Sequence, residues 1–209
     1  MNAALYRRPV ATDGRIGPIA GLTGPVWLRD ASHVDVRFIR ADDSPRLIEL
    51  FQGLSAETIY RRFLHARSVL PAAEAARYAD VDHRGRDALV ACAPGGDRQA
   101  PIVAVARYAQ QDAEAAEGGL VVDDAYQERG LGTILLRRLI ALLRWRGFRY
   151  LRGAVLGENG RMLRLLQATG YPLRIVRDDG AYGTQLDLGI RRASAHSAPG
   201  GEHPSSTPR

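Results

Sequence analysis

Residues 127–133, Gln-Glu-Arg-Gly-Leu-Gly-Thr, combine glycines and a basic side chain at the predicted start of a helix. The first turn of a helix has backbone N–H groups without an intrahelical acceptor, and the helix dipole adds partial positive charge there. Gly130 and Gly132 have no Cβ, so a bulky anion can approach these amides closely. Arg129 adds a positive charge. Together these residues predict a binding site for a pyrophosphate group.

The spacing of these glycines differs from that of two common phosphate-binding loops. A P-loop requires a Lys directly after its second glycine, and the chain contains no Lys. A dinucleotide-binding loop requires a third glycine, where Leu135 stands, and an acidic residue about 20 positions later. Because short glycine motifs are weakly specific, a helix that begins with glycines and binds no ligand stays open as the alternative.

The loop resembles the acyl-CoA pyrophosphate loop of the GNAT superfamily of N-acyltransferases, with Gln127, Gly130 and Gly132 at the motif positions Q-x-x-G-x-G. A second segment, residues 54–63, reads Leu-Ser-Ala-Glu-Thr-Ile-Tyr-Arg-Arg-Phe. It resembles the L-S-x-E-S/T-x-Y-x-R-F stretch of bacterial protein lysine acetyltransferases of the Pat type. The resemblance covers about residues 34–190. A purely structural interpretation of residues 54–63 is an amphipathic helix with Arg61 and Arg62 in solvent, and it is compatible with the resemblance.

The resemblance implies acetyl-CoA, or another acyl-CoA, as the co-substrate. It also implies that this co-substrate contacts three segments: the end of the strand before the loop, the loop itself, and the start of a later helix. These residues are Leu120, Val121, Val122, Gln127, Glu128, Arg129, Gly130, Leu131, Gly132, Thr133, Asn159 and Met162. A plain helix N-cap is an alternative role for Asn159, and the two roles are compatible.

Transfer of an acyl group to an amine requires removal of a proton, because a free Lys amine has a pKa of about 10.4. Glu117 begins the predicted strand that leads into the loop and is the candidate general base, directly or through a water. It matches the catalytic Glu of Pat-type enzymes, which have A-E-V-A-F where residues 116–120 here read Ala-Glu-Gly-Gly-Leu. A solvated Glu at a strand edge is the alternative, and Glu114 takes the role if the register differs.

Two features depart from the family pattern. Gly118 and Gly119 replace an apolar pair, and glycines weaken a strand unless a bulge or a close ligand requires them. GNAT central strands carry such a bulge, which would direct a backbone N–H toward the acyl carbonyl. The Tyr that acts as general acid in many GNAT enzymes corresponds to Leu166, which cannot donate a proton. Tyr171 and Tyr126 are weaker substitutes.

The composition predicts a globular protein of 209 residues with 45% apolar side chains. No apolar run approaches ~18 residues, so no membrane span is expected. Cys92 is the single cysteine and is expected in the core. A single cysteine and the absence of a signal-peptide pattern together favour a cytoplasmic location. The five histidines are scattered, so no metal is expected.

The net charge of +6 comes from 29 arginines and suits an anionic ligand such as CoA. Nucleic acid is a rival ligand, but no basic stripe interleaved with aromatic residues favours it.

The expected order of elements is strand, helices, antiparallel strands, helix, strand, helix, strands. Strands are predicted at 34–38, 87–93, 102–108, 117–122, 150–156, 173–176 and 184–188, and helices at 45–52, from 55, 71–78, from 133, and 161–168. The helix from Thr133 provides the crossover that a parallel pair of strands needs. This pattern and the resemblance predict an α/β GNAT fold: a mixed, mostly antiparallel sheet with helices on both faces and a splayed parallel pair at the acyl-CoA site.

The domain organisation predicted from the sequence has three parts. Residues 1–32 are rich in Gly and Pro and form a flexible or clamping arm with an anchor at Trp27 and Leu28. Residues 33–192 form the acyltransferase domain. Residues 193–209 form a disordered tail, because their composition cannot bury apolar surface.

We therefore predict an acyl-CoA-dependent N-acetyltransferase. The resemblance favours a protein lysine as acceptor, with a partner such as an acyl-CoA synthetase, and neither a nucleic acid nor a membrane as partner. The alternatives are a small-molecule amine N-acetyltransferase and a catalytically silent acyl-CoA sensor. Release of CoA from a thioester distinguishes an enzyme from a sensor, and a steep salt dependence of DNA binding would reveal a nucleic-acid binder.

Overall fold

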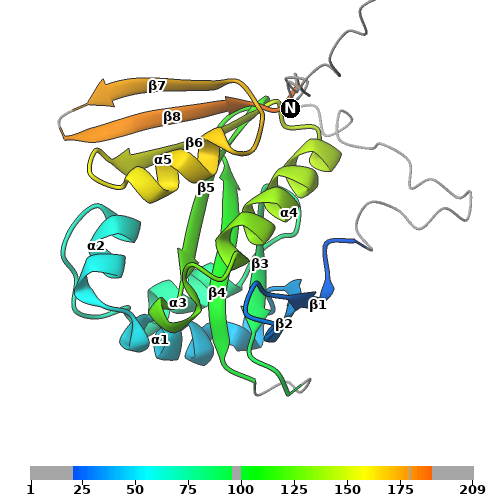
Figure 1. Cartoon of the computed structure of the whole chain (residues 1–209). Coiled ribbons are helices and arrows are strands. Elements are labelled where there is room, and N and C mark those ends of the chain that lie inside the picture. Colours follow the sequence, from blue (N-terminus) through cyan, green and yellow to red (C-terminus); the bar gives the residue numbers. More distant parts are fainter. Residues whose placement is uncertain (1–20, 96–99, 179, 190–209) are drawn as a thin grey trace, which may run out of the picture.

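The computed structural model describes residues 21–95, 100–178 and 180–189 (Figure 1). An eight-stranded sheet in the order β1-β2-β3-β4-β5-β6-β8-β7 forms its centre. The strands are β1 (Gly24–Trp27), β2 (His33–Phe38), β3 (Arg86–Cys92), β4 (Ile102–Gln110), β5 (Ala115–Val122), β6 (Tyr150–Leu156), β7 (Leu173–Asp178) and β8 (Ala181–Asp187). Every described pair of neighbouring strands is antiparallel except β5 and β6, so the predicted mixed sheet is confirmed.

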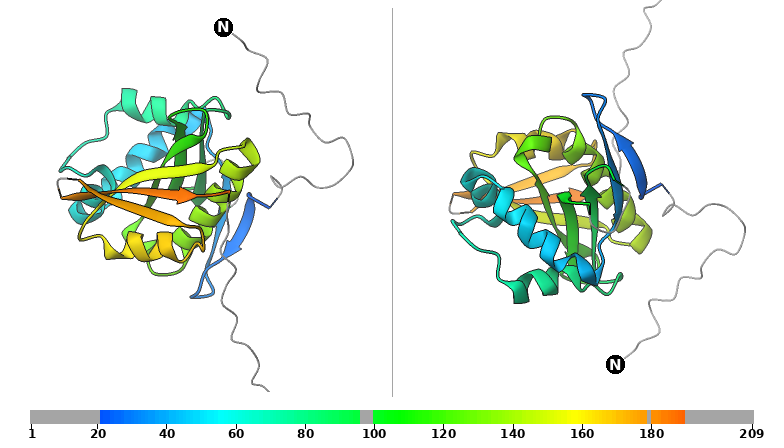
Figure 2. Two further views of the ribbon diagram at one scale, coloured as in Figure 1. Left: turned by 90° about the horizontal axis from the view of Figure 1, so that it is seen from above. Right: turned by 90° about the horizontal axis from the view of Figure 1, so that it is seen from below.

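Helices cover both faces of the sheet, as predicted (Figure 2). Successive strand residues point to opposite faces. The helices are α1 (Ser44–Gly53), α2 (Ala56–Phe63), α3 (Ala72–Ala79), α4 (Leu131–Arg146) and α5 (Gly160–Gln167), with short 3₁₀ helices η1 (Ala41–Asp43) and η2 (Asp124–Tyr126). In β3, Leu89 and Ala91 join α4 in one buried cluster, whereas Val90 and Cys92 join α1 and α3 in another.

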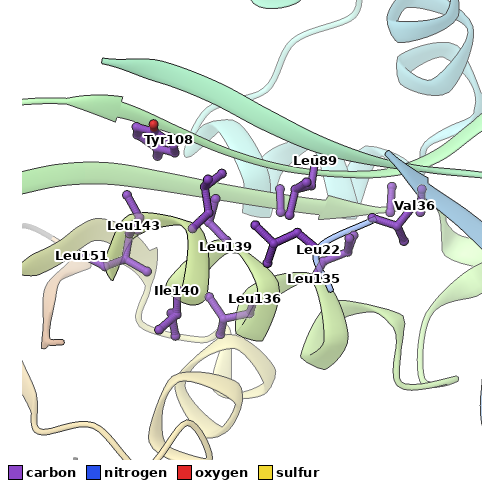
Figure 3. Close-up of a cluster of buried hydrophobic side chains, with 14 of the residues drawn as sticks. Leu22, Val36, Leu89, Tyr108, Leu135, Leu136, Leu139, Ile140, Leu143 and Leu151 are labelled. Carbon is purple, nitrogen blue, oxygen red and sulfur yellow. The ribbon is translucent and has the colours of Figure 1, made fainter. Parts of the chain in front are cut away.

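The central helix α4 packs an apolar stripe on the middle of the sheet. Leu135, Leu139 and Leu143 are fully buried, and Figure 3 shows them on the side of α4 that faces the strands. The helix is capped at its C-terminus by Gly147, where the backbone has φ 92°. It begins at Leu131 rather than at the predicted Thr133, because the chain enters the helix directly from Gly130.

The parallel strands β5 and β6 pair at three positions, the last of which is Glu117 opposite Arg152. Beyond this pair β5 continues with β4, while β6 continues with β8. Figure 1 shows the result: β6, β8 and β7 run across the top of the molecule, at a steep angle to β5. The predicted splay is therefore present, and it begins immediately after Glu117.

The segment before β2 differs from the predicted arm. β1 pairs with β2 as a hairpin at the edge of the sheet, although the sequence showed no strand there. Leu28 is buried and anchors the hairpin, as expected, whereas Trp27 is 70% exposed. Residues 1–20 of the predicted arm and the tail from 193 lie outside the described residues.

The helical segment that resembles Pat-type enzymes begins as predicted, with Ser55 as N-cap and its Oγ accepting a hydrogen bond from Thr58 N at 3.2 Å. Ile59 is buried, whereas Tyr60 is 41% exposed. No helix within the described ranges has the length and apolar content that crossing a bilayer requires.

Candidate active site

A groove of about 480 Å³ opens at the N-terminus of α4. Two of the residues predicted to contact acyl-CoA have side chains outside it: Leu131 is fully buried, and Arg129 pairs with Asp30 at 2.8 Å. Contact of these two residues with acyl-CoA through their backbone stays a prediction. The other ten line the groove: Leu120, Val121, Val122, Gln127, Glu128, Gly130, Gly132, Thr133, Asn159 and Met162. Their contact with acyl-CoA stays a prediction.

The loop at this groove is attached to the N-terminus of α2 through Asp124. Its carboxylate accepts hydrogen bonds from Ser55 N at 2.8 Å, Ser55 Oγ at 2.9 Å and Thr58 Oγ1 at 2.6 Å. Burial alone would raise the pKa of Asp124, but these hydrogen bonds outweigh it and leave the pKa below its ordinary value. Gln127 Nε2 donates to Val122 O at 3.1 Å and closes the turn between β5 and the loop.

The turn between β1 and β2 brings Arg29 into the groove. Arg29 N donates to Arg129 O at 3.0 Å, and the ion pair of Asp30 with Arg129 stabilises this contact between the turn and the loop. The Arg29 side chain then lies over Gly130, where a Cβ would stand 3.4 Å from its Nε. Arg29, which has no ion pair to the residues that the structure describes, therefore brings positive charge to the loop, where the sequence had led us to expect Arg129. Four further arginines line the groove: Arg61, Arg62, Arg161 and Arg164.

The sequence did not predict these basic residues at the groove. Arg29 is far from the loop in sequence, and a contact between two such segments leaves no periodic pattern. Arg161 and Arg164 could have been predicted, because they are three residues apart on the helix that follows Asn159. Arg161 also pairs with Glu128 at 2.6 Å, so its charge is partly compensated.

A narrower cavity of about 80 Å³ lies between the splayed strands β5 and β6 and shares wall residues with the groove. Its walls are mainly apolar and include Leu120, Leu136, Leu151 and Val155. Leu166 is a wall residue too, so the position of the usual general acid holds an apolar side chain, as predicted. Within the described part of the chain, no tyrosine lines this cavity or the groove, so neither Tyr126 nor Tyr171 replaces it.

The two glycines of β5 leave room for side chains of other elements and do not form a bulge. The β4–β5 ladder pairs without interruption from Ala104–Val122 to Gln110–Ala116, so the expected bulge is wrong. A Cβ on Gly118 would stand 2.5 Å from Leu151 Cδ1. A Cβ on Gly119 would stand 2.7 Å from Arg62 Cζ. Both positions are therefore filled by side chains from other elements.

Arg62 lies at the junction of the groove, the splayed cavity and a small apolar cavity under α1 and α2. Its guanidinium has no hydrogen bond or ion pair to any residue that the structure describes. Burial lowers the pKa of Arg62, and the negative charge of Glu117 opposes part of that effect. An arginine remains charged at neutral pH even so. The interpretation that placed Arg62 in solvent is thus wrong.

Glu117 is exposed and lines an open cleft of about 440 Å³. It shares a sheet face with Gly119 and Val121, the face that α2 covers, since strand residues alternate. Gln111 Nε2 donates to its Oε2 at 3.3 Å. The cleft and the splayed cavity share Arg152, Gly153, Ala154 and Thr184 as wall residues. Glu114 does not line the cleft, and its backbone carbonyl accepts hydrogen bonds from Arg149 and Tyr150.

A groove for a large anion, a narrow apolar cavity beside it and a carboxylate at the far mouth suit a thioester that is held along α4 and meets an amine across β5. This geometry is that of an acyl-CoA-dependent N-acyltransferase. Residues 55–171 match the sequence profile of the acetyltransferase (GNAT) family, and the chain belongs to that family. It is accordingly an acyl-CoA-dependent N-acetyltransferase.

Individual relatives agree with this assignment. An acetyltransferase of Pseudomonas aeruginosa is 30% identical over 166 residues, which are 78% of this chain and 89% of that protein. The acetyltransferase Pat of Mycolicibacterium smegmatis is 29% identical over 78% of this chain, which spans about half (48%) of Pat. The crystal structure of the GNAT domain of S. lividans PAT has a TM-score of 0.72 at 29% identity, covering 80% of this chain and 98% of that domain. The predicted similarity to Pat-type enzymes is confirmed.

Proposed function

We propose that the protein transfers an acetyl group from acetyl-CoA to a lysine side chain of another protein, with Glu117 as general base. The observation that carries this proposal is the register of β5 and β6. Glu117 is the last residue of β5 to pair with β6, so its carboxylate stands at the point where the splay begins. A proton acceptor is needed at that point, where an amine would meet the acyl group.

The groove suits the phosphate groups of acetyl-CoA. The backbone N–H groups that follow Gly130 have no intrahelical acceptor, and the absence of a Cβ at Gly132 leaves them open to a bulky anion. Arg29 and Arg164 add positive charge along the wall, whereas the charge of Arg61 is partly compensated by its ion pair with Glu57. The apolar walls between β5 and β6 suit the pantetheine arm, with Leu120 and Val122 on the β5 side.

In the proposed reaction, the amine nitrogen attacks the thioester carbonyl carbon and forms the C–N bond. Its proton passes to Glu117, directly or through a water, because a protonated amine is not nucleophilic. The C–S bond then breaks and the CoA thiolate leaves, to be protonated to the thiol. A thiol of pKa about 8.5 is a good leaving group, so a general acid at the position of Leu166 is not required.

An open acceptor cleft supports a large acceptor. The cleft at Glu117 is about 440 Å³ in volume, and Glu117 itself is exposed. A lysine side chain on the surface of a folded partner can reach such a base without a tunnel. The similarity to Pat adds support for a protein lysine, and an acyl-CoA synthetase is the kind of partner that this resemblance favours.

The substitution Glu117→Gln tests the proposed base. We expect unchanged acetyl-CoA affinity by calorimetry and a loss in kcat/KM of about 10²–10⁴-fold near neutral pH. The loss should shrink as pH rises, because the acceptor amine then deprotonates without help. Glu114→Gln is the matched control and should retain full activity. A wild-type rate for Glu117→Gln at pH 7 would show that the base lies elsewhere.

The acceptor is tested with labelled acetyl-CoA and a lysate of the source organism. Since the chain has no Lys, self-acetylation is restricted to its N-terminal amine, and the enzyme alone should remain nearly unlabelled. Discrete labelled protein bands that disappear with Glu117→Gln are expected. Rapid turnover of small amines with no labelled protein would overturn the lysine acceptor and leave the acetyl-CoA site intact.

A further inference from the structure

Four side chains form one row across the acceptor cleft. Glu117 of β5 is paired with Arg152 of β6, Arg152 with Gln185 of β8, and Gln185 with Arg174 of β7. Directly paired residues of neighbouring strands point to the same face of a sheet, and all four line the cleft. Neighbouring strands are about 4.8 Å apart, so Arg174 lies roughly 14 Å from Glu117, three strand spacings away.

The two arginines of the row are not equivalent. Arg152 Nη1 pairs with Asp112 Oδ2 at 2.9 Å, and Arg152 Nε donates to Gln185 Oε1 at 2.9 Å. Its charge is therefore already compensated. Arg174 is exposed and has no hydrogen bond or ion pair to the residues whose side chains the structure describes. Among the cleft residues whose side chains the structure describes, Glu117 is the only acidic one.

We propose that Arg174 binds a carboxylate of the acceptor, so that the acetylated lysine is one with an acidic residue near it in the chain. This inference rests on the proposed function, because it places the lysine amine at Glu117. An extended peptide advances about 3.3 Å per residue, so roughly 14 Å corresponds to about four residues. The acidic side chain is therefore expected three or four positions from the lysine.

The same geometry opposes other amines. A polyamine or another polycation would bring positive charge to Arg174 and gain nothing from Arg152, whose charge is paired. A free amino acid, even lysine with its ε-amine, is too short to hold its amine at Glu117 and its carboxylate at Arg174. The source of the carboxylate is thus a side chain of a peptide or protein.

Three blocked peptides with one central lysine test the inference, with Glu, Gln or Arg at the positions three and four residues to either side. We expect kcat/KM to fall from the Glu to the Gln to the Arg peptide, by about fivefold at each step, as one exposed charge pair allows. The difference should decrease at high salt, where exposed charges are screened. Free glutamate and spermidine are the small-molecule arms and should be poorer acceptors than the Glu peptide.

Charge reversal makes the test specific to Arg174. Arg174→Glu should invert the order of the three peptides while the affinity for acetyl-CoA stays unchanged. Arg177→Glu is the matched control, because Arg177 is exposed on the same strand but points to the other face, and it should keep the wild-type order. If Arg174→Glu fails to fold, Arg174→Gln should remove the preference for Glu over Gln.

The outcomes separate this inference from the proposed function. Equal kcat/KM for the three peptides in the wild-type enzyme would overturn the role of Arg174 and leave the lysine acceptor standing. Faster turnover of free glutamate than of the Glu peptide would overturn the peptide source of the carboxylate. Acetylation of small amines with no labelled peptide or protein would overturn the proposed function and this inference with it.

Discussion

The guanidinium of Arg62 fills the space that a side chain on Gly119 would need. A Cβ on Gly119 would lie 2.7 Å from Arg62 Cζ, closer than two such atoms approach. Arg62 comes from α2, and Gly119 is two residues beyond Glu117 on the same face of β5. A glycine that weakens the strand thus allows a half-buried cation to lie beside the proposed base, in the wall of the splayed cavity.

Removal of this cation should slow acyl transfer more than it weakens acetyl-CoA binding. The tetrahedral intermediate carries an oxyanion, and loss of a group that stabilises such charge typically lowers kcat by about 10²–10³-fold. We expect a loss of that order for Arg62→Ala, measured by CoA release under saturating acetyl-CoA. Gly119→Ala should reproduce part of it, because the new Cβ displaces the flexible end of Arg62.

The double variant Gly119→Ala/Arg62→Ala distinguishes displacement from an independent effect. If the glycine acts through Arg62, the double variant should be no slower than Arg62→Ala alone, since coupled sites are not additive. Gly118→Ala is the control on the neighbouring residue. Its Cβ meets the buried Leu151, so we expect a lower melting temperature rather than the same kinetic defect. Additive kinetic losses would contradict the displacement mechanism.

Arg29 should contribute to acetyl-CoA affinity although it lies in the hairpin before the core of the domain. Its side chain lies over Gly130 in the wall of the groove. For Arg29→Ala we expect a rise in Kd for CoA of about fivefold, which decreases at high salt because the contact is exposed. Arg137→Ala, an exposed residue of α4 outside the groove, is the control. Comparison of CoA with dephospho-CoA tells whether Arg29 meets the pyrophosphate or the 3′-phosphate.

The elements that carry the site were predictable where the sequence has a local signal. Residues 150–156 were predicted as a strand and form β6 with these bounds, and Ser55 identified the start of α2. β1 was missed because its Gly24 and Pro25 are typical of turns, yet such residues are tolerated on an edge strand. The loop of Gly130 and Gly132 was identified correctly as the start of a helix at the groove.

Side-chain contacts between distant segments could not be predicted from local patterns. The sequence gives no indication that Asp30 would pair with Arg129 and so free Arg29 to reach the groove. The glycine pair of β5 was interpreted as a bulge, because a sequence shows the absence of a side chain but not which other residue fills the space. The row from Glu117 to Arg174 follows from strand register, which depends on the whole sheet.

Asp124 should couple the stability of the co-substrate loop to that of α2. Its carboxylate accepts hydrogen bonds from Ser55 and Thr58, and Gln127 Nε2 lies 3.3 Å from Asp124 Oδ1. Asp124→Ala removes the acceptor of Ser55 and Thr58, and because these hydrogen bonds are exposed we expect a loss of about 0.5–1.5 kcal/mol. We expect a lower melting temperature and a higher Kd for acetyl-CoA. Asp123→Ala, which removes only the N-cap of η2, is the milder control. An unchanged Kd in the Asp124 variant would show that the loop holds its shape alone.

The wall of α2 and α3 beside the active site should lose stability in acid through Glu74. Its carboxylate accepts hydrogen bonds from Arg67 Nη2 at 2.6 Å and from Tyr78 Oη at 2.6 Å. Arg67 in turn lies over the Phe63 ring at 4.6 Å. The hydrogen bonds from Arg67 and then Tyr78 lower the pKa of Glu74 to about 2 from an ordinary value of 4.5.

A carboxylate whose pKa is lower in the folded than in the unfolded state stabilises the fold above the unfolded pKa. The stabilisation by Glu74 is therefore complete above pH 4.5 and is lost as the pH falls toward about 2. Glu74→Gln should lower the free energy of unfolding at pH 7 by at most about 3 kcal/mol. The difference from wild type should shrink between these two pH values, as followed by urea unfolding at each pH. Glu49→Gln, at an exposed position of α1, should match wild type throughout. A gap between Glu74→Gln and wild type that stays constant down to pH 2 would show that the glutamine loses packing rather than charge.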